Sequence, residues 1–192
     1  MTNANGTLPN IRLKPLKWTP HLPPLEMEDA TPAQLKAMQV TPSAKKVSPY
    51  VRTLAHDPES YEARTRLFND IMYVEGGLQN VDRELGALSA SFVNGCMYCA
   101  NVHARRQASL AGSSQTIAAL YFNRLDRLSA RDKAILAFSE ALSATPPQAD
   151  QSHISALRDA GLDDAEIVDL MHSVAIFGWA NRLMHPLGWS KV

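Results

Sequence analysis

The chain has 192 residues, of which 45% are hydrophobic and 20% charged, so it is long enough for one domain with a sizeable core. Its formal net charge is zero, which argues against nucleic acid or an anionic membrane surface as a partner. No apolar run approaches the ~20 residues of a membrane span, and the first residues lack the features of a signal peptide. We therefore expect a cytoplasmic protein, in which a Cys-x-x-Cys pair is more often redox-active or metal-binding than structural.

The N-terminal part, residues 1–47, differs in composition from the rest of the chain. Closely spaced prolines between Leu13 and Pro24 exclude a helix or a central strand, because proline lacks an N–H and biases the preceding residue toward extended geometry. The same stretch carries large apolar side chains such as Trp18. We expect an extended arm that packs on its own body or on a neighbouring subunit, with a short helix that Thr31 caps and that runs to about Val40.

From residue 48 onward the apolar residues recur with helical spacing, and no segment alternates convincingly with period two. We therefore expect an all-α domain over residues 48–192, built as an antiparallel helical bundle. Its expected helices cover residues 49–56, 58–75, 81–92, 96–110, 113–121, 133–144, 152–160 and 164–177. The glycines and prolines between these segments are typical helix boundaries.

Both cysteines of the chain, Cys96 and Cys99, follow the natural helix break Asn94-Gly95. They should therefore lie in the first turn of the next helix, where free N–H groups and the helix dipole favour a thiolate. The spacing places Cys96, Cys99 and His103 along one helical face. His103 lies one turn beyond Cys99, so its imidazole can act as a base for that thiol.

A carboxylate in the preceding helix fits the same site. If the chain reverses near Gly95, Glu84 lies about ten residues before the turn and His103 about eight after it. At ~1.5 Å per residue the two side chains are displaced by similar distances along the hairpin. We expect the Glu84 carboxylate to orient the imidazole of His103, which would make a Glu–His–Cys relay.

At these residues the sequence resembles a known family. Glu84, then Cys96-Met97-Tyr98-Cys99, then His103 is similar to the Glu…Cys-x-x-Cys-x-x-x-His signature of the alkylhydroperoxidase D type proteins, within the carboxymuconolactone decarboxylase-like superfamily. The flanking residues 81–85, 181–184 and 187–188 resemble its peroxidase-related branch. The signature covers about 35 residues, and a weaker likeness extends over roughly residues 48–190.

The resemblance implies an all-helical fold, a homo-oligomer and peroxide reduction by the cysteine pair. By the same resemblance Cys99 attacks the peroxide, Cys96 resolves it, His103 is the base and Glu84 orients that base. The substrate would be an organic hydroperoxide or hydrogen peroxide, and an external dithiol or lipoyl-type reductant would restore the thiols. No cofactor or resident metal is implied. Where established peroxidases of the family tend to carry a second histidine, this chain has Tyr98, a poor base near neutral pH.

Three other interpretations of the motif stay open. The two cysteines could be simple packing residues, because free cysteine buries readily. Cys96, Cys99 and His103 could bind zinc with Glu84 or His172 as the fourth ligand, although structural zinc sites usually show a second Cys or His pair. The pair could also serve redox sensing or disulfide exchange with little peroxidase turnover.

The surroundings of the motif carry two further expectations. We expect Arg105 and Arg106 to lie on a solvated helix face, with one of them able to raise the local positive potential. An apolar lining suited to an organic hydroperoxide is expected from five side chains: Phe92, Val93, Met97, Tyr98 and Trp179.

Overall fold

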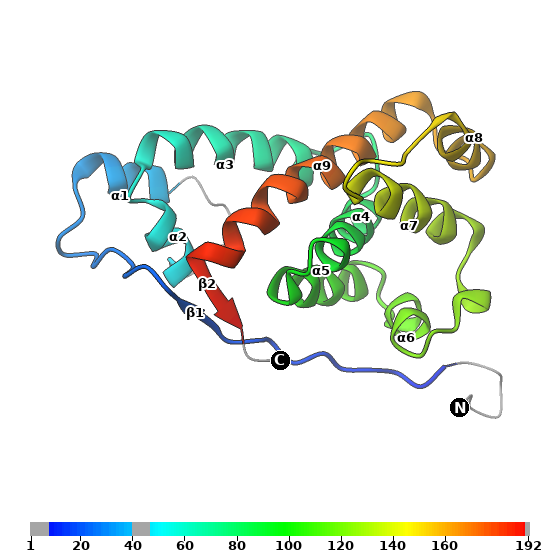
Figure 1. Ribbon diagram of the computed structural model, residues 1–192, viewed down its shortest axis with the longest axis horizontal. Coiled ribbons are helices and arrows are strands. Elements are labelled where there is room, and N and C mark those ends of the chain that lie inside the picture. Colours follow the sequence, from blue (N-terminus) through cyan, green and yellow to red (C-terminus); the bar gives the residue numbers. More distant parts are fainter. Residues whose placement is uncertain (1–7, 40–46, 191–192) are drawn as a thin grey trace.

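The computed structural model describes residues 8–39 and 47–190, and Figure 1 shows how their elements are arranged. In chain order these are β1 (Trp18–Pro20), α1 (Pro32–Met38), α2 (Pro49–Leu54), α3 (Pro58–Tyr73), α4 (Asn80–Val93), α5 (Met97–Leu110), α6 (Gln115–Tyr121), the 3-10 turn η1 (Leu125–Arg127), α7 (Ala130–Ser143), α8 (Gln151–Asp159), α9 (Asp164–Leu187) and β2 (Gly188–Ser190). The prediction of an all-α fold is confirmed. Thr31 caps its helix through a side-chain hydrogen bond, as predicted, and Ser48, Asp57 and Ser129 cap α2, α3 and α7 in the same way. Two starts differ from the prediction by more than one residue: α6 begins at Gln115 instead of residue 113, and α7 at Ala130 instead of residue 133.

The two short strands depart from the expectation of helices alone after residue 48. β1 from the arm pairs antiparallel with β2, with Trp18 opposite Ser190. Such a two-stranded ribbon has only edge strands, which is where proline is tolerated. Gly188 allows the contact, because a Cβ at this position would lie 2.4 Å from the Trp18 ring.

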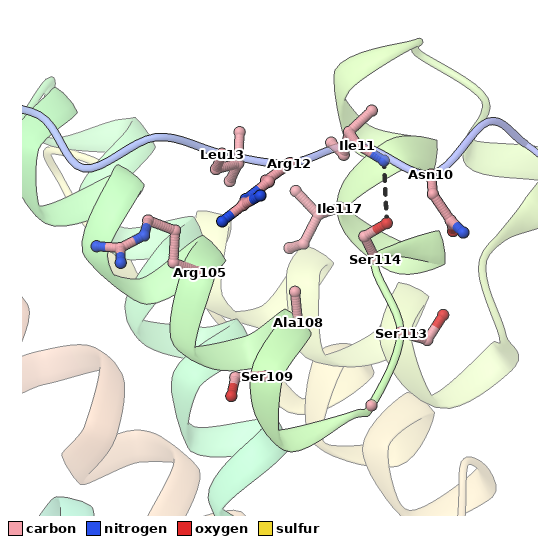
Figure 2. A pocket seen from close by; sticks show the side chains of 11 residues that line it. Asn10, Ile11, Arg12, Leu13, Arg105, Ala108, Ser109, Ser113, Ser114 and Ile117 are labelled. Carbon is pink, nitrogen blue, oxygen red and sulfur yellow. Dashed lines mark hydrogen bonds between the residues drawn. The ribbon is translucent and has the colours of Figure 1, made fainter.

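The described part of the arm packs along its own body, as the lower edge of Figure 1 shows. Asn101 on α5 donates to the carbonyl of Lys14 over 3.0 Å, and the amide of Leu8 donates to the Gln115 side chain. Further along, the amide of Ile11 donates to Ser114 Oγ at 3.1 Å, at the rim of a cavity of about 400 Å³ between the arm, α5 and α6 (Figure 2). The extension of α1 toward Val40 lies outside the described residues, and the division into an arm and a helical domain stays a prediction.

Helix α4 is the centre of the main core and packs against α5, α7 and α9. Leu85 and Leu88 are each 1% exposed, so each contributes on the order of 1.5–3 kcal/mol through burial. Gly86 lets α9 approach closely, because a Cβ there would lie 2.9 Å from Leu170 Cδ1. This packing fixes the axis of α4 and with it the position of Glu84.

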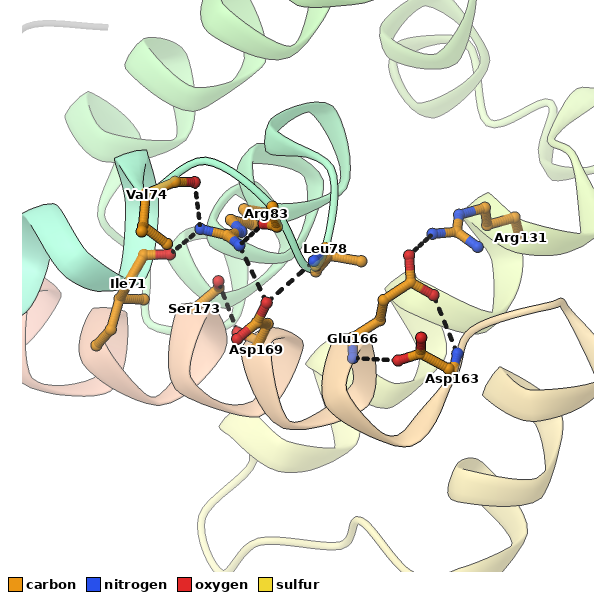
Figure 3. Close-up of polar contacts among 10 residues, drawn as sticks. Ile71, Val74, Leu78, Arg83, Arg131, Asp163, Glu166, Asp169 and Ser173 are labelled. Carbon is orange, nitrogen blue, oxygen red and sulfur yellow. Dashed lines mark hydrogen bonds and ion pairs between the residues drawn. The ribbon is translucent and has the colours of Figure 1, made fainter.

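The residue beside Glu84 ties α4 to its neighbours (Figure 3). Arg83 is fully buried, donates to the carbonyls of Ile71 and Gly76, and pairs with Asp169 on α9 over 3.0 Å. The same Asp169 oxygen accepts from the amide of Leu78. A buried guanidinium with several partners holds the α3–α4 loop and α9 in one arrangement.

Helix α9 extends ten residues beyond the predicted end at Phe177. A glycine inside a helix costs about 1 kcal/mol relative to alanine, so Gly178 looks like a stop signal in the sequence. The following turns are nevertheless held by packing, because Asn181 and Met184 are 0% and 4% exposed. This extension brings α9 to the cysteine pair.

Candidate active site

The cysteine pair lies at the turn between α4 and α5. Gly95 has φ of +70°, a left-handed conformation that favours glycine, so the chain reverses where Asn94-Gly95 predicted it. Cys96 is the N-cap of α5 and Cys99 lies in its first turn, as expected. The two thiols are free and buried, and their Sγ atoms lie 2.7 Å apart.

The pKa values of the two thiols are shifted in opposite directions. The hydrogen bond with Cys99 lowers the pKa of Cys96 from 9.0 to about 7, with smaller contributions from the charge of His185 and the Asn181 amide. The hydrogen bond with Cys96, together with burial, raises the pKa of Cys99. The pair therefore titrates as one coupled unit, which loses its first proton near neutral pH and favours keeping the second on Cys99.

The predicted contact between Glu84 and His103 is present. Glu84 Oε2 lies 2.6 Å from His103 Nδ1, and both side chains are more than nine-tenths buried. The other carboxylate oxygen pairs with Arg106 Nε at 2.8 Å, and Arg106 in turn donates to the hydroxyl of Tyr73. Because a carboxylate can only accept a hydrogen bond, His103 Nδ1 donates to Glu84, which fixes the ring and leaves Nε2 as the nitrogen that can act on a thiol or a substrate.

Cys99 and His103 line one cavity of about 360 Å³, which lies among α2, α3, α5 and α9. The His103 ring packs edge-on against Phe177, with centroids 4.3 Å apart, which fixes its plane. No direct hydrogen bond between His103 and either sulfur is found among the described residues. We call this space the Cys99 cavity.

Cys96 opens instead onto a smaller cavity of about 230 Å³ beneath the β1–β2 ribbon. Trp18 and Trp189 line it, together with His185, whose Nε2–H donates to the carbonyl of Asn94 over 2.8 Å. The two sulfurs are thus in contact with each other but border different spaces.

The comparisons with known proteins concern the family and the fold. Residues 58–126 match the sequence model of the carboxymuconolactone decarboxylase family, a segment that contains Glu84, both cysteines and His103. The resemblance to the alkylhydroperoxidase D-like, carboxymuconolactone decarboxylase-like superfamily is confirmed. None of the curated proteins matches the sequence at a significant level.

Three solved structures illustrate the shared fold. The alkylhydroperoxidase AhpD core of a peroxidase-related protein from Ralstonia eutropha JMP134 is 24% identical over 88% of this chain and 90% of its own, with a TM-score of 0.75. A peroxidase-related protein from Silicibacter sp. TM1040 is 24% identical over 90% and 94%, with a TM-score of 0.72. The debrominase Bmp8 is 22% identical over 84% and 87%, with a TM-score of 0.71. At these identities the likeness shows the fold alone.

The lining of the Cys99 cavity differs from the prediction. Tyr98 does line it, but Phe92, Val93 and Met97 do not, and all three are more than a third exposed. Trp179 is 46% exposed and is not among the lining residues. The apolar lining comes instead from α2, α3 and α9, which are distant in sequence: Tyr50, Phe68, Phe177 and Met184.

Arg106 also corrects an expectation. Arg105 is exposed as predicted, whereas the Arg106 side chain is 37% exposed and binds Glu84 inside the site. Its position three residues after His103 was the available signal, because i, i+3 residues share a helix face. Sequence reasoning also assigned no chemistry to Asn181, whose amide donates to Ser91 Oγ over 3.2 Å and lowers the pKa of Cys96.

The zinc-binding interpretation is not supported within residues 8–39 and 47–190. No group of three or more His, Cys, Asp or Glu side chains there is placed to hold a metal ion. His172, the proposed fourth ligand, is exposed on α9. In the same described ranges, no helix is long and apolar enough to cross a membrane.

Proposed function

We propose that the protein is a thiol-dependent peroxidase of the alkyl hydroperoxide reductase type. One observation carries the proposal: Cys99 and a carboxylate-held histidine, His103, line the same cavity, and Cys96 lies in contact with Cys99. A nucleophile, a positioned base and a resolving thiol are the groups that peroxide reduction needs.

In the proposed first step, the Cys99 thiolate attacks the outer oxygen of the hydroperoxide. The S–O bond forms as the O–O bond breaks, and the leaving alkoxide takes a proton to become an alcohol. The resting proton on Cys99 first passes to Cys96, or to His103 through a water molecule or the bound peroxide. When the proton moves to Cys96, the alkoxide takes a proton from solvent; when it moves to His103, the protonated His103 supplies the proton and Cys96 stays a thiolate.

In the second step, the Cys96 sulfur attacks the sulfenic sulfur of Cys99. The S–S bond forms as the S–OH bond breaks, and the leaving hydroxide takes the Cys96 proton or a solvent proton to become water. An external dithiol then reduces the disulfide and is itself oxidised, which returns both thiols. The cavity volume of about 360 Å³ and its aromatic lining suit an organic hydroperoxide.

We further propose that the protein acts as a homo-oligomer. Large apolar side chains are exposed at the end of α4, the start of α5 and on α6; Phe92, Val93, Met97 and Tyr121 are between 39% and 71% exposed. Phe92, Met97 and Tyr121 line one largely apolar hollow of about 550 Å³. A second copy of the chain covering this surface would remove it from water.

Disulfide exchange without fast peroxide turnover is the second candidate, and Tyr98 favours it. Tyr98 lies between the two cysteines where a second base would otherwise stand. Burial raises the pKa of its hydroxyl further above neutrality. Among the residues that line the Cys99 cavity, His103 is then the base available to that thiol.

Thiol counting tests the two candidates. The reduced protein receives one equivalent of cumene hydroperoxide, and the free thiols are titrated before and after, with and without a dithiol. The peroxidase proposal predicts the loss of two thiols per chain and continuous peroxide consumption with the dithiol. Loss of both thiols without turnover would favour disulfide exchange. Because Bmp8 is a debrominase, a bromopyrrole serves as a parallel probe, and bromide release without peroxide consumption would contradict the proposal.

A further inference from the structure

The Cys99 cavity contains a second arginine that the proposed peroxide chemistry does not use. Arg64 projects from α3, lines the cavity and is half-buried. Its guanidinium lies over the Phe68 ring at 4.5 Å and near the Trp179 ring at 5.7 Å. Its Nε is buried without a hydrogen-bond partner. Stacking orients this guanidinium, and no hydrogen bond from it to another of the described residues is found.

The two arginines that line the cavity differ in whether they have a counter-ion. One of them, Arg106, is neutralised by Glu84 at 2.8 Å. Arg64 has no ion pair among the described residues, and no aspartate or glutamate lines the cavity. The nearest surface arginine on the same helix, Arg66, pairs with Glu62. A partly desolvated guanidinium without a counter-ion is a binding site for an anion.

The Cys96 thiolate is not that counter-ion, because it borders the smaller cavity, which Arg64 does not line. The groups that lower the pKa of Cys96 are Cys99, His185 and Asn181, and Arg64 is not among them for either cysteine. The charge of Arg64 instead acts on Tyr50, whose hydroxyl pKa burial raises to about 12. A neutral tyrosine cannot balance the guanidinium charge, so the guanidinium is left to pair with an anionic group on a bound molecule.

We propose that Arg64 recognises a carboxylate on the substrate, so that the preferred substrates are acid-bearing organic hydroperoxides of moderate size. This inference rests on the proposed function, because it assigns the substrate class of the Cys99 cavity. The guanidinium fork matches a carboxylate in a bidentate manner, while Phe68 and Phe177 contact the apolar part. A volume of about 360 Å³ holds roughly a dozen non-hydrogen atoms at the ~30 Å³ that each water occupies in the liquid.

The binding test uses the reduced protein without peroxide and two probes of equal size, octanoate and octanamide. Each is measured by calorimetry and by how far it slows alkylation of Cys99 by iodoacetamide, located by mass spectrometry, because Cys99 borders this cavity and Cys96 does not. Octanoate is expected to bind about 10–100-fold more tightly than octanamide. Arg64→Met should abolish that preference, Arg64→Lys should retain part of it, and the control Arg66→Met should leave it unchanged. Equal binding of the two probes to the wild-type protein would overturn the inference, whether or not the variants fold.

A kinetic test separates this inference from the proposed function. Cumene hydroperoxide carrying a para-carboxylate is compared with its para-carboxamide, with kcat/KM as the readout. The inference predicts a preference for the acid that Arg64→Met removes and Arg66→Met does not. Turnover of both substrates without discrimination would overturn the role of Arg64 and leave the peroxidase intact. Absence of any turnover, with octanoate preference preserved, would overturn the peroxidase and leave the carboxylate site.

Discussion

The Glu84 carboxylate lies 2.6 Å from Nδ1 of His103, although nineteen residues separate them in the chain. The contact follows from the α4–α5 hairpin, which places residues at similar distances from the Gly95 turn side by side. Because Arg106 occupies the second carboxylate oxygen, Glu84 is held on both sides. Since His103 stands between Glu84 and Cys99 in the proposed relay, substituting His103 tests the relay.

Removing the imidazole should slow the thiols while leaving the fold intact. His103→Ala is expected to lower the rate of peroxide consumption by a factor of ~10²–10⁴, the usual loss for a general base. Glu84→Gln should cost less, because the amide still orients the ring but no longer stabilises its protonated form. His172→Ala, an exposed histidine on α9, is the matched control. A rate unchanged by His103→Ala would remove the relay from the account.

The acidity of the pair gives a second prediction. Thiolate absorbance at 240 nm should show one ionisation per chain near pH 7, the pKa of Cys96, and none from Cys99 until strongly alkaline pH. Cys99→Ala should raise the pKa of Cys96, because it removes the hydrogen bond that lowers it most. Cys96→Ala should lower the pKa of Cys99 toward its ordinary value. Two equal ionisations in the wild-type protein would contradict the coupling.

The same pKa shifts set the pH dependence of stability. The folded pKa of Cys96 lies below its unfolded value, so its contribution appears as pH rises through about 7 and is lost as pH falls. The folded pKa of Cys99 lies above its unfolded value, so its contribution is lost above about pH 9. The reduced protein should therefore gain stability as pH rises from about 7 to 9 and melt highest near pH 9, where the Cys96 contribution is complete and the Cys99 contribution is not yet lost. A variant with both cysteines replaced by alanine should not show this maximum, and its persistence there would speak against a thiol origin.

Two helix glycines should respond oppositely to substitution. At Gly86 an added Cβ would lie 2.9 Å from Leu170 Cδ1, so Gly86→Val should destabilise the protein by about 1–3 kcal/mol through overpacking. At Gly178 the nearest atom to an added Cβ is the flexible end of Arg182 at 3.4 Å. Gly178→Ala should stabilise by up to ~1 kcal/mol, because alanine favours the helix. Thermal melting measures both, and a stabilising Gly86→Val would show that α4 and α9 are not closely packed.

Features that depend on residues close together in the sequence could be predicted, whereas features that depend on contacts between distant segments could not. Local rules located the helices, because caps such as Thr31 and Ser129 act within one turn. The end of α9 was missed because packing of Asn181 against α4 outweighs the cost of Gly178. The contact between Glu84 and His103 could be predicted because the two residues lie at similar distances from the turn that joins two adjacent antiparallel helices. Arg64 and Phe68 come from α3, and no spacing rule connects α3 to the motif, so their place in the Cys99 cavity could only be found in three dimensions.

The central claim is that Cys99 attacks the peroxide and Cys96 resolves the product. The lowered pKa of Cys96 would by itself favour Cys96 as the attacking thiolate, so the claim needs a direct test. One measurement tests it most directly: Cys96→Ser and Cys99→Ser are each treated with one equivalent of cumene hydroperoxide and dimedone, and the adducts are located by mass spectrometry. We expect Cys96→Ser to carry a dimedone adduct on Cys99, and Cys99→Ser to consume no peroxide. Peroxide consumption by Cys99→Ser, with the adduct on Cys96, would contradict the account and assign the attack to the N-cap thiolate of α5.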